Sequence, residues 1–333
     1  APSPPPAPTW CTGSPNITST TTPWSPLPSP VLERYPAREV PLGGIRAAKV
    51  LRTLPHRELP TVGAWCFLDS FAPGDPPMNV LPHPHIGLQT VTWPLSGQMR
   101  HRDTLGSDQI LRPGELNVMT RGDGVAHSEW RVDENGASGL QLWVALPEAA
   151  LHVPSDFQHV SNLPVLIYPG VKLTVFIGEH DGVASPARIH SPLVGLEIEI
   201  DDGASFDLSL RPDLEYAALV TANAVTLEGE ELTHDSGDLL YLGGGRTAVS
   251  LHASHGPARL TVLGGEPLAE DLVMWWNFVG RSHEDVAGAR ADWEDRERRE
   301  VRFGVVQGHG DALIPAPPLP NLRLTPRRRR REP

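Results

Sequence analysis

The sequence predicts an all-β protein with two β-domains in tandem. Short segments rich in β-branched and aromatic residues recur along the chain, separated by Gly, Pro or Asp about every eight to twelve residues. Pro (36) and Gly (31) are both frequent among the 333 residues, which favours short strands and turns over long helices. The pattern fills 45–147 and 173–263, with a Pro-containing break at 161–170 between them. Such spacing is typical of sandwiches and barrels.

Six segments carry this pattern most clearly. Each is short, apolar and rich in Val, Ile, Leu, Thr or aromatic residues, as half-buried or fully buried strands are. They are LQTVTWPL (88–95), QLWVAL (141–146), LTVFIG (173–178), LEIEID (196–201), EYAALVT (215–221) and RLTVLGG (259–265).

The two ends of the chain differ in composition from the rest. Residues 1–32 contain no charged side chain and consist largely of Pro, Ser, Thr and Ala, so we expect a disordered tail over 1–36. Five arginines occupy 327–331, and we expect 327–333 to be a solvated tail. A nucleic-acid or localisation patch is the alternative for this run. The remaining ranges, 37–160 and 161–326, are the two predicted domains.

One stretch near the end predicts a helix. Ser282 and Asp285 have the spacing of an N-cap and its acidic partner, and VAGARADWEDRERRE follows. The alternation of Glu and Arg indicates a solvent-facing helix that ends near Arg302 and packs on the outside of a barrel. We expect no catalytic role for it.

The composition excludes several classes of protein. A formal net charge of −12 gives no general affinity for nucleic acid. Two cysteines, Cys11 and Cys66, cannot form a disulfide framework or a Cys-based zinc site. The sequence has no run of 18 or more apolar residues, so it predicts no membrane span. Its first residues lack the basic and apolar regions of a secretory signal peptide. We therefore expect a cytoplasmic protein, and separately we expect a monomer.

Two short motifs each place metal-binding side chains two residues apart. They are His83-Pro-His85 and His127-Ser-Glu129. In a strand, residues i and i+2 point to the same face, so each pair can converge on one ion. The prolines beside His83 cannot donate to a β-ladder, which indicates an edge or strand-entry position. The forty residues between the motifs suffice for several short strands, so the chain can return beside its first strand.

The order of motifs around these residues resembles the pirin family of bicupin proteins. PHPHIGLQTVTW (82–93) is followed by HRDTLGSDQILRPGELNVMTRGDGVAHSEW (101–130). VPLGG (40–44), LRTLPHRELPTVGAWCFLDSF (51–71), GLQLWVALP (139–147), LGGEPLAEDLVMWWNFVGRS (263–282) and APPLPN (316–321) are similar to pirin segments as well. The resemblance covers about residues 37–326 and implies two cupin-type β-barrels.

The resemblance implies a single metal ion in the first barrel, within 37–160. The family's four ligands correspond to His83, His85, His127 and Glu129. Iron is the usual family metal, and nickel, manganese, copper or zinc also suit a nitrogen and oxygen ligand set. The second barrel, 161–326, lacks a His-x-His pair and is expected to hold no metal.

The resemblance also implies two alternative functions. One is quercetin 2,3-dioxygenase chemistry, in which O2 opens a flavonol and carbon monoxide is released. Glu129 would then act as a metal ligand and as the general base for the flavonol hydroxyl. The other is a non-enzymatic, iron-dependent and redox-responsive regulator that binds transcription factors or metabolic enzymes. We favour the dioxygenase, which needs a flavonol-like substrate and O2.

Three features near the motifs have secondary interpretations. The general cupin pattern has a Glu ligand where this chain has Gln89, a position that pirins do not use. His101, in the HRD motif, is expected to form hydrogen bonds and not to bind the metal. The MWWNF run (274–278) is expected to pack between the domains.

Overall fold

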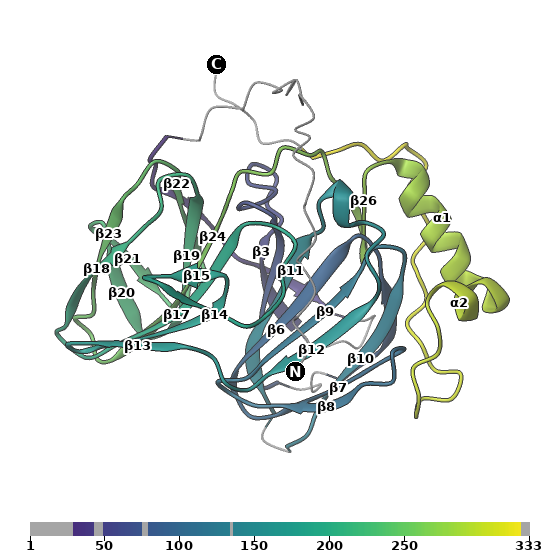
Figure 1. The fold of residues 1–333 in the computed structure, drawn as a ribbon, viewed down its shortest axis with the longest axis horizontal. Coiled ribbons are helices and arrows are strands. Elements are labelled where there is room, and N and C mark those ends of the chain that lie inside the picture. Colours follow the sequence, from purple (N-terminus) through teal and green to yellow (C-terminus); the bar gives the residue numbers. More distant parts are fainter. Residues whose placement is uncertain (1–28, 43–48, 75–78, 134–135, 328–333) are drawn as a thin grey trace, which may run out of the picture.

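The computed structural model describes residues 29–42, 49–74, 79–133 and 136–327. Two β-barrels stand side by side, and two short helices lie against the outer side of the first (Figure 1). Each barrel combines one seven-stranded and one four-stranded sheet. The predicted all-β class with two cupin-type barrels is therefore confirmed. No helix of the described residues is long and apolar enough to cross a membrane.

The first barrel carries the two metal-binding motifs on strands of its four-stranded sheet. Its seven-stranded sheet has the order β12 (Asp156–Val160), β9 (Leu116–Arg121), β6 (Leu88–Ser96), β11 (Ser138–Ala145), β4 (Trp65–Phe71), β3 (Lys49–Leu54) and β2 (Arg38–Pro41). Its four-stranded sheet has the order β5 (Asn79–His85), β10 (Val125–Arg131), β7 (Met99–Asp103) and β8 (Asp108–Leu111).

The second barrel repeats this architecture. Its seven-stranded sheet has the order β1 (Glu33–Tyr35), β22 (Leu239–Gly243), β19 (Glu215–Ala222), β24 (Ala258–Gly265), β17 (Leu193–Ile200), β14 (Val171–Ile177) and β13 (Val165–Tyr168). Its four-stranded sheet has the order β18 (Ser205–Ser209), β23 (Ala248–His252), β20 (Ala224–Leu227) and β21 (Glu230–Thr233). All six segments singled out in the sequence form strands: β6, β11, β14, β17, β19 and β24.

Smaller elements complete the fold. They are a 3₁₀ turn at Glu148–Ala150, the hairpins β15 (Glu179–His180) with β16 (Val183–Ala184) and β25 (Val273–Trp275) with β26 (Phe278–Gly280), and the helices α1 (His283–Glu294) and α2 (Arg296–Arg302).

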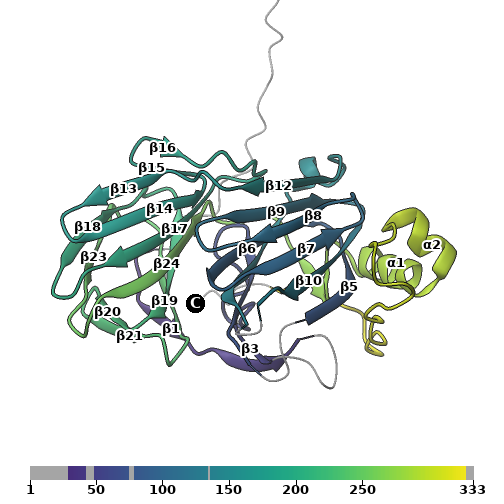
Figure 2. The same ribbon diagram turned by 90° about the horizontal axis from the view of Figure 1, so that it is seen from below.

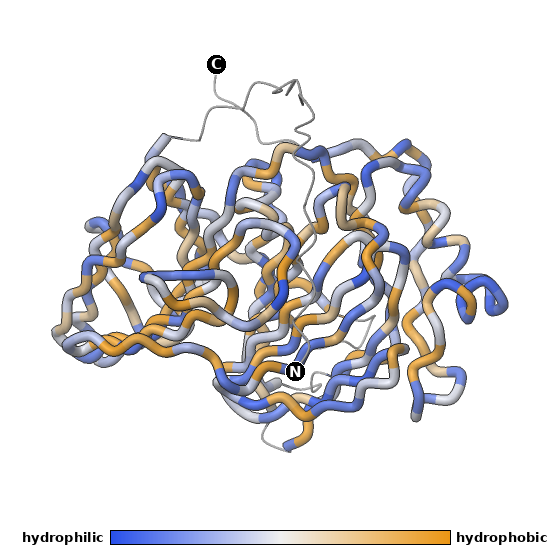
Figure 3. Tube along the Cα trace, in the orientation of Figure 1, coloured by the Kyte–Doolittle hydropathy of each residue, from blue (hydrophilic) through white to orange (hydrophobic). Residues whose placement is uncertain are grey.

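The two seven-stranded sheets pack face to face, and one apolar cluster joins them. Val91 of β6 and Leu142 of β11 share it with Leu219 of β19 and Leu263 of β24. Side chains alternate between the faces of a strand, so the next residues along these strands face a barrel interior instead. Figure 3 shows this alternation of hydrophobic and hydrophilic positions along many strands.

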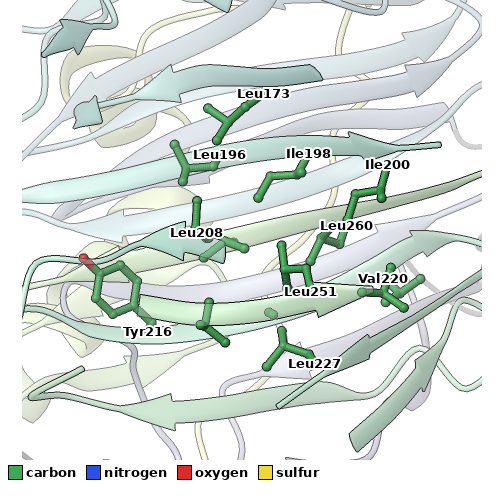
Figure 4. Packing of buried hydrophobic residues seen from close by; sticks show 14 of the residues in the cluster. Leu173, Leu196, Ile198, Ile200, Leu208, Tyr216, Val220, Leu227, Leu251 and Leu260 are labelled. Atoms are coloured by element: carbon green, nitrogen blue, oxygen red, sulfur yellow. The ribbon is translucent and has the colours of Figure 1, made fainter. Parts of the chain in front are cut away.

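Aliphatic side chains fill the interior of the second barrel. Leu196 and Ile198 of β17 meet Leu260 of β24 and Leu251 of β23 there (Figure 4). The interior of the first barrel differs, because its strands direct buried polar side chains inward, among them His83, His85, His127 and Glu129.

The predicted disordered tail, 1–36, is too long, because its last residues form a strand. Residues 1–28 lie outside the described part, but Glu33–Tyr35 form β1, which lies at the second barrel (Figure 2) and pairs there with β22. The stretch without charged side chains ends at Leu32, before this strand. Strand β1 forms because it gains hydrogen bonds to β22 and buries the Tyr35 side chain. Of the Arg-rich tail, only Arg327 lies within the described residues.

The expected second domain, 161–326, is likewise not one compact unit. After β24 the chain returns to the first barrel, where β26 lies beside β5 and Ile314 donates its N–H to the Pro82 carbonyl at 2.9 Å. The predicted helix is present with its capping box at Ser282 and Asp285, but it is two helices. Asp295 separates them, because its side chain accepts from the Arg298 N–H and starts α2.

A buried hydrogen bond between the barrels gives a prediction for stability. Trp93 Nε1 donates to Glu197 Oε2 at 2.8 Å, and burial raises the pKa of this carboxyl. Trp93→Phe would leave the buried Glu197 without this donor, which costs about 1–3 kcal/mol of unfolding free energy. Chemical denaturation measures the loss. Trp130→Phe is the control, because the buried Trp130 Nε1 has no partner among the described residues. Equal losses in the two variants would contradict the assignment.

Candidate metal centre

The two metal-binding motifs lie on neighbouring antiparallel strands. His83 and His85 end β5, and His127 of β10 stands directly opposite His83 in the register. β5 is the edge strand of its sheet, as the flanking prolines predict. The register shifts after this pair, because Glu129 pairs with Val80. Between the pairs His127–His83 and Glu129–Val80, β5 has two residues and β10 has one, as in a β-bulge.

A glycine fixes the path of the chain directly after the His-Pro-His motif. Gly87 has φ +68°, and a Cβ there would lie 2.0 Å from the carbonyl oxygen of Val279. The close approach lets the Val279 N–H donate to the Ile86 carbonyl at 3.2 Å. β26 thereby covers the end of β5 that carries the histidines.

Three histidines converge on one point. The ligand atoms of His83, His85 and His127 all lie within 4.8 Å of one another, and all three side chains are buried. His85 Nε2 and His127 Nε2 are 3.0 Å apart. Two nitrogens at right angles around an ion, each about 2.1 Å from it, are separated by about 3.0 Å. The arrangement thus matches two adjacent ligands of one metal ion.

Backbone carbonyls fix the orientation of two imidazoles. His83 Nδ1 lies 2.9 Å from the Leu81 carbonyl, and His85 Nδ1 lies 3.2 Å from the Asn277 carbonyl. Each Nδ1 donates its proton there, which leaves each Nε2 with a free lone pair. Asn277 and the preceding Trp276, whose φ is +51°, form the turn between β25 and β26. Trp276 and Asn277 of the MWWNF run therefore lie at the metal centre, which corrects the predicted place of the run between the domains.

The third histidine is oriented by a chain of polar side chains. His127 Nδ1 lies 3.3 Å from His101 Nδ1, and His101 Nε2 lies 3.1 Å from Asp103 Oδ2. The other oxygen of Asp103 accepts the N–H groups of Leu105 and Ser107, both at 2.9 Å. A carboxylate can only accept, so His101 donates from Nε2 and its Nδ1 receives the His127 proton. This order leaves His127 Nε2 free for a metal.

Glu129 also lies close to His127. A carboxylate oxygen of Glu129 and one ring nitrogen each of His127 and His101 all lie within 4.8 Å of one another. Among the described residues, no group at that spacing contains Glu129 together with all three converging histidines. Glu129 Oε1 lies 3.1 Å from the hydroxyl of Thr92, which also lies 3.0 Å from Gln141 Oε1. The Thr92 hydroxyl holds the carboxylate toward the barrel interior.

The electrostatics of the site suit a bound cation. Burial lowers the pKa of His83 to about 4 and lowers those of His85 and His127 well below the ordinary value, so these imidazoles are neutral donors at pH 7. Burial raises the pKa of Glu129, which the neighbouring His101 and the Thr92 hydrogen bond oppose. Neutral nitrogens and a desolvated carboxyl gathered in one place are the donor set of a divalent metal.

The position that a general cupin uses for a Glu ligand points elsewhere. Gln89 donates to Thr120 Oγ1 at 2.8 Å and to the Arg188 carbonyl at 3.1 Å, toward the second barrel. Side chains alternate between the two faces of β6, and Gln89 shares a face with Val91, which packs in the cluster between the sheets. Gln89 therefore faces away from the barrel interior.

A cavity of about 150 Å³ adjoins the metal centre. The three histidines and Glu129 line it together with Gln141, Arg52 and Asp69, several aromatic rings, and Trp276, Asn277 and Ile314 from the returning C-terminal part. Sequence motifs alone did not predict these cavity residues, since they come from strands that only the folded sheet brings together.

Comparison with known proteins identifies the family. The pirin family model matches residues 44–144, and the model of the pirin C-terminal cupin domain matches residues 195–299. A Pseudomonas aeruginosa protein named "putative quercetin 2,3-dioxygenase" is 39% identical over 296 residues, covering 87% of this chain and 91% of its own. The chain belongs to the pirin family.

Solved structures agree with this membership. A quercetin 2,3-dioxygenase from Acinetobacter baumannii is 35% identical with a TM-score of 0.81, and the match covers 88% of this chain and 97% of that one. A bacterial pirin from Escherichia coli in complex with nickel(II) shares the fold at 15% identity and a TM-score of 0.56, over 72% of this chain and 100% of that one. The pirin fold therefore extends across both barrels of this chain.

Within this pirin the HRD motif gives a test of the metal centre. Asp103→Asn can donate to His101, reverse its proton order and deprive His127 of its acceptor, so metal affinity should fall about 10- to 100-fold. Competition with a chromophoric chelator measures this affinity. Asp108→Asn is the matched control, since Asp108 lies on the same hairpin but pairs with Arg100 on the surface. Unchanged affinity in a folded Asp103→Asn protein would refute the orienting role.

Proposed function

We propose that this protein is a metal-dependent dioxygenase that opens flavonol-type substrates. The observation that carries the proposal is the convergence of His83, His85 and His127 beside Glu129, at the wall of a partly aromatic cavity. The names of the Pseudomonas aeruginosa and Acinetobacter baumannii proteins support the reaction class. His83, His85, His127 and Glu129 would hold a single ion, for which iron is our first choice and nickel, manganese, copper or zinc the alternatives.

The overall reaction balances without an external reductant. Both atoms of O2 enter the organic product, the two ring bonds at carbon 3 of the flavonol break, and this carbon leaves as carbon monoxide. A metal ion held by these four residues would supply Lewis acidity, and a redox-active one would supply electron exchange as well. The flavonol itself provides the electrons that reduce O2.

The chain's own residues would prepare the substrate. The Glu129 carboxylate is the base that removes the proton of the flavonol 3-hydroxyl, and burial, by raising its pKa, makes it a stronger base than an exposed Glu. The Thr92 hydroxyl keeps that carboxylate in position. The rings of Trp143, Phe67 and Trp276 line the cavity and exclude water from the substrate.

Glu129→Gln tests the proposed base. The amide cannot accept the proton, so flavonol turnover should fall at least about 100-fold, within the usual range for loss of a general base. Decay of flavonol absorbance and release of carbon monoxide under O2 are the readouts, with metal content measured in each sample. Glu115→Gln is the control, because Glu115 accepts from the Arg112 N–H near the surface. Absence of wild-type turnover with iron, nickel, manganese and copper would contradict the proposal.

The expected cytoplasmic location and monomeric state stay predictions from the sequence. They do not enter the chemistry proposed for the site.

A further inference from the structure

The hairpin of β25 and β26 has a two-residue loop with an unusual residue at its first position. Trp275 pairs with Phe278, so Trp276 and Asn277 form the loop. Trp276 has φ +51°, in the left-handed region of the backbone. Two-residue hairpin loops normally have Gly, Asn or Asp at such a position, because a positive φ strains a bulky residue. Strain of this kind is found most often at ligand-binding and catalytic sites.

Two contacts fix the strained loop beside a metal-binding histidine. The Asn277 carbonyl oxygen lies 3.2 Å from His85 Nδ1 and accepts its proton. The Trp276 ring packs edge-to-face on the fully buried ring of Phe278, with the ring centres 5.4 Å apart. The conformation of this loop therefore determines the orientation of His85.

The indole of Trp276 is also part of the cavity wall. It is only half-buried by its packing, and it lines the cavity next to the metal centre. Trp143 and Phe67, whose rings stack at 3.9 Å, line the same cavity from the seven-stranded sheet. A residue needed only for the turn would be Gly or Asn, so the turn does not account for the indole.

A flat aromatic ligand suits this surface. Aromatic rings pack on one another in offset-stacked or edge-to-face arrangements, and an indole offers a large face for either. A flavonol whose 3-hydroxyl lies at the metal centre carries its aryl rings beside that hydroxyl, where the aromatic side chains line the cavity. Because Trp276 and Asn277 are neighbours in one turn, a ring packed on Trp276 has a defined position relative to His85.

We propose that Trp276 is a specificity-determining residue that packs against the aryl rings of a flavonol, while its strained turn holds the Asn277 carbonyl on His85. The inference rests on the proposed function for the identity of the substrate. It deepens that function, because it assigns the recognition of the aryl rings to one side chain. Recognition of the substrate and orientation of a metal ligand thus depend on the same turn.

Binding of two probes to the metal-loaded full chain in the absence of O2 tests the role of the indole. 3-Hydroxyflavone is the parent flavonol, and maltol has the same hydroxypyranone group without aryl rings. Trp276→Gly removes the indole and suits a positive φ. It should weaken 3-hydroxyflavone binding at least about ten-fold and leave maltol binding unchanged, since only the flavonol contacts the indole. Absorbance titration gives the dissociation constants.

Two results of this titration would overturn the role of the indole. One is unchanged binding of 3-hydroxyflavone in Trp276→Gly. The other is equal weakening for both probes, because this would place the effect at the metal and not at the aryl rings. Trp276→Phe keeps an aromatic ring on the turn, so it should bind 3-hydroxyflavone more tightly than Trp276→Gly does.

Trp276→Val tests the role of the turn. A β-branched residue disfavours a positive φ, so the Asn277 carbonyl should move away from His85. Metal affinity should then fall about 10- to 100-fold, as it does when a metal-binding histidine loses its acceptor. Trp276→Gly should keep the wild-type metal affinity, although both variants lack the indole. Competition with a chromophoric chelator measures both, and equal affinities would overturn the role of the turn.

Trp275→Leu is the matched control for loss of an indole from this hairpin. Trp275 packs against Phe278, with ring centres 6.5 Å apart, and is not one of the described residues that line the cavity. Both dissociation constants should stay at their wild-type values. If Trp275→Leu weakens 3-hydroxyflavone binding as much as Trp276→Gly does, the effect belongs to the folding of the hairpin and the inference is wrong.

The outcomes separate this inference from the proposed function. Selective weakening of 3-hydroxyflavone binding in Trp276→Gly, without oxygenation of any flavonol by the wild type, supports the role of the indole and contradicts the dioxygenase function. Flavonol turnover whose kcat/KM is unchanged in Trp276→Gly supports the function and contradicts the role of the indole.

Discussion

The face-to-face packing of the two seven-stranded sheets determines which residues of the first barrel are free for chemistry. Leu142 and Val91 are committed to the cluster between the sheets. The alternation of a β-strand then turns Gln141, Trp143 and Thr92 toward the interior. The cavity wall formed by β6 and β11 therefore follows from the residues that join the barrels, since both come from the same strands, whereas the metal-binding side chains come from β5 and β10.

The two barrels use the same architecture for different purposes. In the second, Leu, Ile and Val fill the interior, and this packing stabilises the fold. In the first, the same space holds buried histidines and carboxyl groups, which cost free energy to desolvate unless they are paired. Backbone carbonyls at Leu81 and Asn277 and the chain from His101 to Asp103 offset part of this cost. They also fix the proton on each imidazole.

Local patterns predicted the strands, the capped start of α1 and the two metal-binding motifs, because each depends on residues close in sequence. The edge position of β5 followed from Pro82 and Pro84 in the same way. Features that depend on distant residues were missed. The contact of His85 with Asn277 joins positions 192 apart, and the use of Glu33–Tyr35 by the second barrel has no local signal. His101 and Asp103 were visible as a motif, but their role requires the register of β7 with β10.

Elemental analysis combined with X-ray absorption of the purified protein tests the central claim most directly, namely that one metal ion binds where β5 and β10 meet. The account predicts one ion per chain with imidazole ligands in the wild type, and loss of that ion in His127→Ala. A wild-type protein that takes up no metal when supplied with iron or nickel, or a His127→Ala protein that retains a full equivalent, would contradict it.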